Sequence, residues 1–465
     1  MKKSNWLVLF IISALLLILN GCFSPYGADE TNITISLGDL GRVAVSSAEI
    51  NTLSYEVILD GPGGRRTESF SGTSTSIRVR PGTYNVMVRA IGNNPGGAYL
   101  TDFPARMLRG WGSTRVSIRP GGDNNVSIAM ATATEVTTSA QITAALGQSA
   151  AMGSREHIIV IKGTVAAPAS NSVSGRVTLV AEDASTINMS NASFSVPNPV
   201  TNRLTLGKEG MGGTLTLDGR GAHNEALINV SGTLEMNDGV TLKNRFFTPG
   251  YGAGVSLTSS GIFTMNGGTI QDNTASLSGG GVYIPNGATF TMNGGTIEGN
   301  TAQQGGGVFN NGTFIVERGI IRNNKAVGHS TNPTPEPSGG GIYTNGTFTV
   351  NDFIEISGNH AEKAGASGRG GGIFWIGGNI YINNCRIVNN YANSTGGGIF
   401  ETTNSSSLSI TIHAGIISGN IAVDDGGGLG GGWGGFPGPT INFSLNVIVT
   451  GNTLSNGTPS DGWPP

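Results

Sequence analysis

The side chains with the clearest potential for chemistry are Asp424 and Asp425, the only adjacent pair of carboxylates in the repetitive second half of the sequence. Two carboxyl groups that flank a sugar linkage can cleave it by acid/base or nucleophilic catalysis. The repeat pattern places this pair in the same variable turn as Ser276–Ser278 and Asn393–Thr395, and no histidine or Arg-x-Lys motif accompanies it. The pattern therefore favours a solvated turn over a catalytic site.

Other short motifs offer as little chemistry. Residues Ser357–His360 spell SGNH, the four residues of an esterase class, but here they form one continuous stretch of a repeat. The run Gly426–Gly435 lacks the aspartates of calcium-binding nonapeptide repeats. No GGG triplet precedes a helix and a lysine as a phosphate loop would, and the five histidines lack metal-ligand spacing. We therefore predict no catalytic residue, no metal and no cofactor.

A repeat dominates the sequence from Gly232 onward. Its unit is GGG-(V/I)-(Y/F), an apolar alternation such as ATFTM, then GGTI, and then I-x-x-N with an alanine within two residues. The triplets are 26 to 34 residues apart, after a degenerate GAG at Gly252, and begin at Gly279, Gly305, Gly339, Gly370, Gly396 and Gly426. A fixed core with variable insertions is the signature of a solenoid.

The unit from Gly279 to Ala302 fits one coil of a right-handed parallel β-helix. Phe290 and Met292 share one face of a short strand and should point into a core, while a second strand centres on Ile297. A third strand covers Val282 and Tyr283. We expect roughly ten such coils, about 50 Å in length at the usual strand spacing. The glycines would then supply positive φ angles at corners rather than bind a ligand.

An asparagine follows each second strand at a fixed distance of three residues from an isoleucine or valine. Stacked from coil to coil, these amides would pair with one another and satisfy buried turn groups. We predict an asparagine ladder of Asn273, Asn300, Asn324, Asn359, Asn390, Asn420 and Asn452.

The aromatic residue after each triplet has two interpretations. Either it packs in the core, which is the commoner case, or it faces outward while the preceding valine or isoleucine points inward. In the second case the rings would form a stripe on which sugars could stack, made of Tyr283, Phe309, Tyr343, Phe374 and Phe400.

The first residues indicate secretion. Lys2 and Lys3 precede an apolar run, which leads into Leu19-Asn20-Gly21-Cys22 and resembles a bacterial lipoprotein signal. The resemblance implies cleavage before Cys22 and acylation of that residue, so we assign residues 1–21 to the signal peptide and 22–31 to a tether. Cys385 would then be the only thiol left, as a small buried hydrophobic side chain.

Two modules are predicted after the tether. Residues 32–131 contain short alternating segments punctuated by Pro81-Gly82 and Pro120-Gly121, which is typical of a β-sandwich. The stretch RPGTYNVMVRA resembles an edge of prealbumin-like or immunoglobulin-like bacterial modules. Residues 132–465 form the β-helix, and its first coil should be covered by a short helix capped by Thr138-Ser139 and ending at Gly147. The fold class is therefore all-β.

The repeats resemble the GGAI and FxxN repeats of chlamydial polymorphic outer membrane proteins over about 252–452. The resemblance implies a surface β-helix, of the solenoid type also found in pectate lyases, and an adhesive role. This sequence differs by having isoleucine in place of the phenylalanine of FxxN, and by ending at SDGWPP without a membrane barrel. A lipid at Cys22 would replace the barrel as the anchor.

These observations predict a non-catalytic adhesin or ligand-display scaffold, lipid-anchored in the cell envelope, with an outer membrane and surface location. Host or matrix proteins or glycans are the expected partners, bound at a lateral face or at the long insertions Val327–Ser338 and Glu362–Arg369. Nucleic acid is not expected, because the net charge is −3. The alternatives are a carbohydrate-active β-helix enzyme, a lyase or hydrolase, and a purely structural envelope protein.

Overall fold

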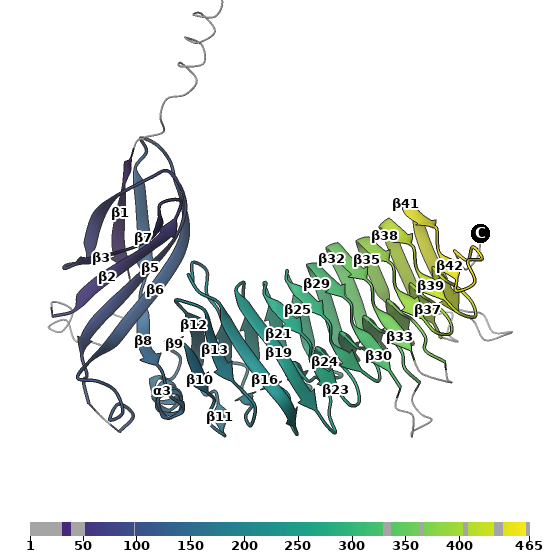
Figure 1. Ribbon diagram of the computed structural model, residues 1–465, viewed down its shortest axis with the longest axis horizontal. Coiled ribbons are helices and arrows are strands. Elements are labelled where there is room, and N and C mark those ends of the chain that lie inside the picture. The colour runs from purple at the N-terminus through teal and green to yellow at the C-terminus, as the bar shows by residue number, and fades with distance from the viewer. Residues whose placement is uncertain are drawn as a thin grey trace, which may run out of the picture.

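The computed structural model describes residues 30–38, 52–96, 98–328, 336–362, 367–402, 408–431 and 440–461. Within these residues the chain forms two all-β modules in sequence, as expected. Figure 1 shows the first module at one end and a long series of coils extending away from it.

The N-terminal module consists of two sheets with a shared apolar core. One sheet has the order β4-β1-β7, and the other is an antiparallel sheet of order β3-β2-β5-β6. Inward side chains from both sheets, such as Ile33, Val57 and Val88, are buried in one cluster. The strands are β1 (Thr31–Gly38), β2 (Ser54–Gly61), β3 (Gly64–Phe70), β4 (Ser74–Val79), β5 (Gly82–Asn93), β6 (Arg106–Ile118) and β7 (Asn124–Ala129).

Strand β8 (Ala131–Val136) joins the two modules. It pairs antiparallel with β6 at Gly110 and Trp111, and parallel with the first strand of the coils, β9 (Glu156–Ile161). The four-stranded sheet of the first module is therefore continuous, through β8, with a sheet of the second.

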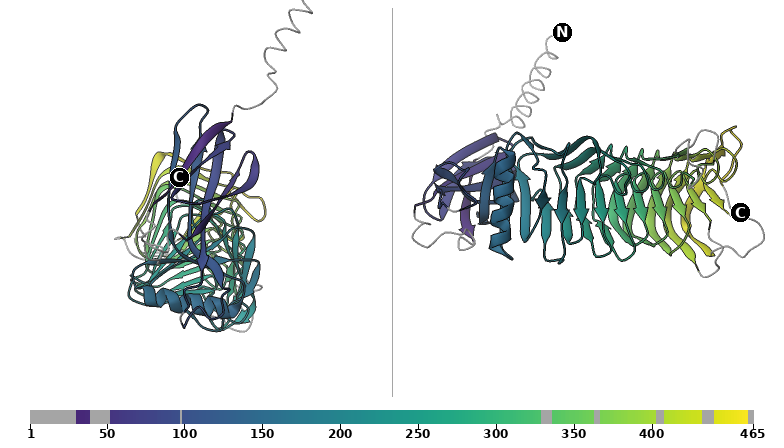
Figure 2. Two further views of the ribbon diagram at one scale, coloured as in Figure 1. Left: turned by 90° about the vertical axis from the view of Figure 1, so that its left-hand side faces the viewer. Right: turned by 90° about the horizontal axis from the view of Figure 1, so that it is seen from below.

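Helix α3 (Ser139–Met152) lies against the first coil, as Figure 2 shows. The Thr138 side chain accepts a hydrogen bond from the backbone N–H of Gln141, and Ile142, Ala145 and Leu146 are buried. The helix covers the end of the β-helix as predicted, but it does not end at Gly147. A glycine suits position 147 inside the helix because a Cβ there would lie only 2.6 Å from the ring of Tyr99. The helix ends instead at Gly153, which has φ of 64°.

The second module is a parallel β-helix in which every strand pairs with its equivalent in the next coil. Its first sheet contains β9, β12 (Arg176–Ala181), β15 (Arg203–Leu206), β18 (Thr233–Met236), β21 (Ile262–Met265) and β25 (Thr289–Met292). The second sheet contains β10 (Thr164–Ala166), β13 (Ser185–Asn188), β16 (Leu215–His223), β19 (Val240–Phe247), β22 (Thr269–Gln271) and β26 (Thr296–Glu298).

In the later coils the first two strands merge into one long strand. The turn Asn293-Gly294-Gly295, with φ of 92° at Gly295, separates β25 from β26, whereas later coils have no such double glycine. The merged strands are β29 (Thr313–Arg322), β32 (Thr347–Ser357), β35 (Ile380–Val388), β38 (Ser409–Ser418) and β41 (Thr440–Thr450).

The third sheet has ten strands, in agreement with the expected number of coils. These strands are β11 (Asn171–Ser172), β14 (Phe194–Val196), β17 (Ile228–Val230), β20 (Val255–Leu257), β24 (Val282–Ile284), β28 (Val308–Asn310), β31 (Ile342–Thr344), β34 (Ile373–Trp375), β37 (Ile399–Glu401) and β40 (Leu429–Gly431). Short strands follow the ladder asparagines: β23 (Thr274–Ala275), β27 (Thr301–Ala302), β30 (Lys325–Val327), β33 (His360–Glu362), β36 (Tyr391–Ala392), β39 (Ile421–Ala422) and β42 (Thr453–Leu454).

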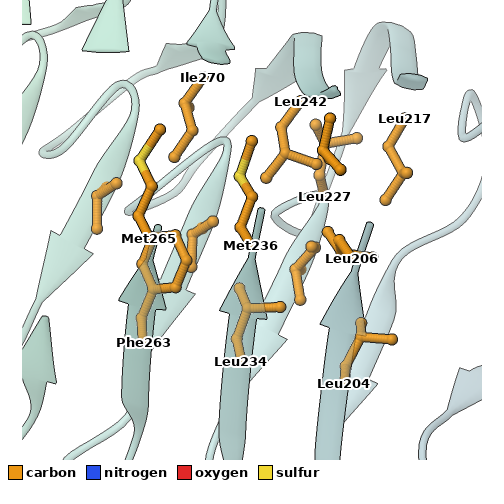
Figure 3. Close-up of a cluster of buried hydrophobic side chains, with 14 of the residues drawn as sticks. Leu204, Leu206, Leu217, Leu227, Leu234, Met236, Leu242, Phe263, Met265 and Ile270 are labelled. Atoms are coloured by element: carbon orange, nitrogen blue, oxygen red, sulfur yellow. The ribbon is translucent and has the colours of Figure 1, made fainter. Parts of the chain in front are cut away.

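The core of the coils consists of stacked apolar side chains. Leu204, Leu234 and Phe263 occupy equivalent positions in successive coils, as Figure 3 shows. Phe263 begins a run of parallel rings, with 4.6 Å between its centroid and that of Phe290. Because each strand alternates inward apolar and outward polar residues, the outer faces carry mostly threonine and charged side chains.

Candidate binding pocket

The glycine triplets form tight corners, and their backbone groups are occupied by the neighbouring coil. The N–H of Gly280 donates to the carbonyl of Gly305, and that of Val282 donates to Gly307. Gly279 has φ of 69°, and a Cβ at Gly280 would lie 2.4 Å from the carbonyl oxygen of Gly306. The triplets therefore have no free N–H groups with which to cradle a ligand.

The asparagines after each second strand form a continuous buried ladder. Each side-chain amide donates to the side-chain oxygen of the next asparagine at 2.9–3.1 Å, and that oxygen also accepts from the backbone N–H of the first. All seven side chains are fully buried: Asn273, Asn300, Asn324, Asn359, Asn390, Asn420 and Asn452.

Two charged residues that the repeat pattern did not indicate end this ladder. Asp461 accepts from both the backbone N–H and the side-chain amide of Asn452, at 3.0 Å each, and so takes the place of an eighth asparagine. At the other end, Arg245 donates its backbone N–H to Asn273, while its buried guanidinium donates to the carbonyl of Met189. Burial lowers the pKa of Arg245 to about 10.

The aromatic residues after the triplets face away from the main core, and Val282, Val308 and their equivalents point into it. The rings nevertheless do not form an open stripe. They stack on one another with centroids 4.6–5.5 Å apart, and Phe309, Tyr343, Phe374 and Phe400 are only 3–8% exposed. Tyr283 is partly buried. Because ring faces contact ring faces, a sugar cannot stack along the row.

A pocket of about 350 Å³ lies at the C-terminal end of this aromatic row. Phe400 forms part of its wall, and the guanidinium carbon of Arg369 lies 5.7 Å from the centre of that ring. The next coil has Gly430 where an aromatic ring would continue the row. The residues that line the pocket are Ser367, Arg369, Ser394, Thr395, Phe400, Asp424, Asp425 and Gly431.

Both carboxylates of the pocket are held by hydrogen bonds. Asp424 Oδ2 accepts from the hydroxyl of Ser394 at 2.8 Å, and Asp425 Oδ1 accepts from the backbone N–H of Gly426 at 2.7 Å. Thr395 Oγ1 is buried and has no hydrogen-bond partner among the described residues. The pocket thus brings two carboxylates and one guanidinium group together beside an aromatic ring.

The described ends of the two long insertions meet beside the pocket. Residues 329–335 and 363–366 lie outside the described residues, but the ends of both insertions are described. Arg369, at the end of the second insertion, forms an ion pair with Glu336 of the first at 3.0 Å. Strands β30 and β33 also pair Val327 with Glu362. The structure therefore brings the ends of the insertions, which the repeat places at one corner of consecutive coils, together with the carboxylate pair and the end of the aromatic row.

Other residues considered for chemistry are not accessible or not grouped. The Ser149 hydroxyl lies 2.7 Å from His157 Nδ1, which resembles a nucleophile and base, but both residues are fully buried where α3, which contains Ser149, packs on β9, which contains His157. Burial raises the pKa of the Cys385 thiol to about 12. In the part of the chain that the structure describes, no three His, Cys, Asp or Glu side chains are grouped for a metal.

The lipidation site proposed at Cys22 lies outside the described residues. Over the described residues, no helix has the length and hydrophobicity that a bilayer crossing requires.

Comparison with known proteins supports the class of fold. Residues 228–415 match the family model of the right-handed beta helix region. This match covers most of the explicit repeats and agrees with the right-handed parallel β-helix of the second module. No curated protein and no solved structure matches the chain.

Proposed function

We propose that this protein is a lipid-anchored surface adhesin that binds a hydroxyl-rich ligand, such as a glycan, in the corner pocket beside Arg369. The observation that carries the proposal is the joint presence of Arg369, Asp424 and Asp425 around one hollow that has an aromatic wall. Carboxylates and guanidinium groups bind sugar hydroxyls by charge-assisted hydrogen bonds. The rigid coils would hold these groups in place without a ligand, which reduces the cost of binding.

The protein itself holds both carboxylates of the pocket in position. Asp424 and Asp425 each accept a hydrogen bond from the chain, so their orientation as acceptors for ligand hydroxyls is set before a ligand binds. The predicted anchor at Cys22 and the resemblance to surface β-helix repeats are consistent with an adhesive role.

The direct test is a binding assay with the full chain against arrays of glycans and matrix proteins. We expect Arg369→Ala to weaken binding by about tenfold or more, the typical result of losing a charged hydrogen bond. Arg322→Ala is the matched control, because Arg322 also pairs with a glutamate, Glu298, but on a lateral face. An unchanged affinity in Arg369→Ala, or no ligand at all, would contradict the proposal.

A carbohydrate-active enzyme is the second candidate, because the same pocket contains two carboxylates. Incubation with polysaccharides and measurement of new reducing ends or unsaturated products would distinguish it. Degradation that is lost in both Asp424→Asn and Asp425→Asn would replace the adhesin proposal. If neither a ligand nor a product is found, the remaining alternative is a structural envelope protein.

A further inference from the structure

The C-terminal end of the β-helix leaves one long strand edge open. Strand β41 pairs with β38 on one side, and no described strand pairs with its other side. Its eleven residues span 440–450. An unpaired edge offers a row of backbone N–H and C=O groups to another strand.

Residues that follow β42 cover other parts of the last coil. The bridge between Thr453 and Pro459 folds the chain back on β42, and the carbonyl of Ser460 accepts from Gly428 beside β40. Asp461 ends the asparagine ladder at the same corner. Within the described residues, β41 is therefore the one long edge that the last coil leaves unpaired.

The open strand lacks the features that normally protect an edge. Its sequence, TINFSLNVIVT, contains no charged residue and no proline. Phe443 occupies the inward position that Ile412 occupies one coil earlier, but it is 37% exposed whereas Ile412 is fully buried. The apolar interior thus reaches the surface at this end, next to unpaired backbone.

The opposite end of the β-helix cannot supply the missing strand. There β9 already pairs with β8, and α3 covers the apolar interior of the first coil. Head-to-tail pairing of β41 with β9 of another copy is therefore blocked. A second β41 is a suitable partner, because an antiparallel pair about a twofold axis matches each edge with itself, and a strand without charges meets no like-charge repulsion.

We propose that two copies of this protein associate end to end through antiparallel pairing of their β41 strands. The contact is independent of the corner pocket and adds a partner to the proposed function, namely a second copy of this chain. Pairing would continue the sheet from one copy into the other and would cover Phe443 of both.

The test measures the mass of the full chain in mild detergent by light scattering over a range of concentrations. We expect a dimer, and we expect Phe443→Lys to shift it to a monomer by placing two charges at the junction. Ile448→Lys is the matched control, because Ile448 lies on the same strand but is 55% exposed on the outer face. This control should remain dimeric.

Cross-linking of single-cysteine variants that keep Phe443 tests whether β41 forms the dimer contact. This experiment remains informative if Phe443→Lys fails to fold. Asn446→Cys, next to the midpoint of β41, should give cross-linked dimers with a short bismaleimide, whereas Thr291→Cys on a lateral face should not. Cys385 is buried and should remain unreactive. A monomer at all concentrations, or dimers cross-linked through residue 291 and not 446, would overturn the proposal.

Discussion

The asparagine ladder shows how one residue type meets a requirement that the fold repeats in every coil. In this fully buried corner the NH₂ group of each asparagine donates to a backbone carbonyl and to the side-chain oxygen of the next asparagine. The side-chain oxygen also accepts from the backbone N–H of the preceding asparagine. A second row, Asn237, Asn266 and Asn293, links the exposed turns between the first two strands at 2.8–2.9 Å. The two rows have the same chemistry but opposite exposure, and so should differ in their contribution to stability.

We expect Asn324→Ala to reduce the free energy of unfolding by about 2–4 kcal/mol, because it leaves buried groups of Asn300 and Ile297 without partners. Asn293→Ala should cost less than about 1 kcal/mol, since water replaces its hydrogen bond. Denaturant unfolding of both variants measures the difference. Equal losses in the two variants would mean that burial does not determine the contribution of the ladder.

The ladder positions could be predicted from sequence because only a few residue types fit a corner that recurs at regular spacing. The pocket could not, because it arises where the pattern is broken. Gly430 replaces an aromatic residue, and Arg369 comes from an insertion whose path the repeat does not determine. Arg245 and Asp461, which end the ladder, also occur only once, so no periodicity indicates them.

At the scale of elements, α3 and β8 form the cap of the first coil around a buried histidine. The Ser149 hydroxyl donates to the carbonyl of Ala145 and lies 2.7 Å from His157 Nδ1. The Thr134 hydroxyl lies 2.9 Å from His157 Nε2 and also donates to the side chain of Gln148. The sequence indicated the cap but not its length, because the glycine at 147 allows close approach of Tyr99 and does not end the helix.

Burial lowers the pKa of His157 to about 4 in the folded protein, below the usual value of 6.5. The unfolded chain therefore binds a proton first as the pH falls, and we expect stability to decrease between about pH 6.5 and 4. The total loss from this residue should be about 3 kcal/mol. Unfolding measured across this range should show a weaker pH dependence in His157→Gln, whereas the control His413→Gln should retain the dependence of the parent.

At the scale of the whole molecule, one sheet runs from β3 in the first module to β41 in the last coil. Side chains reinforce the junction: Trp111 Nε1 donates to Glu182 at 3.1 Å, and Arg89 pairs with Glu135 at 2.6 Å. A sequence-based boundary near residue 131 separates the modules along the chain, but it could not reveal that β8 belongs to both.

We expect the two modules to unfold together, because their sheets are hydrogen-bonded and share the buried residues of the junction. Arg89→Ala, which leaves Glu182 buried without its cation, should separate the single calorimetric transition into two. Arg318→Ala removes an exposed ion pair with Asp352 and serves as the control. Two transitions in the parent chain would show that the junction does not couple the modules.

The alignment of this sheet also determines how the molecule should respond to a pulling force. The hydrogen bonds between coils run along the long axis, so axial tension from the first module to the last coil would act on them in series. The pairing of β6 with β8 comprises only two residue pairs, whereas β38 and β41 share nine. Under such tension the junction at Gly110 and Trp111 should separate first, and the coils that hold the pocket should remain folded.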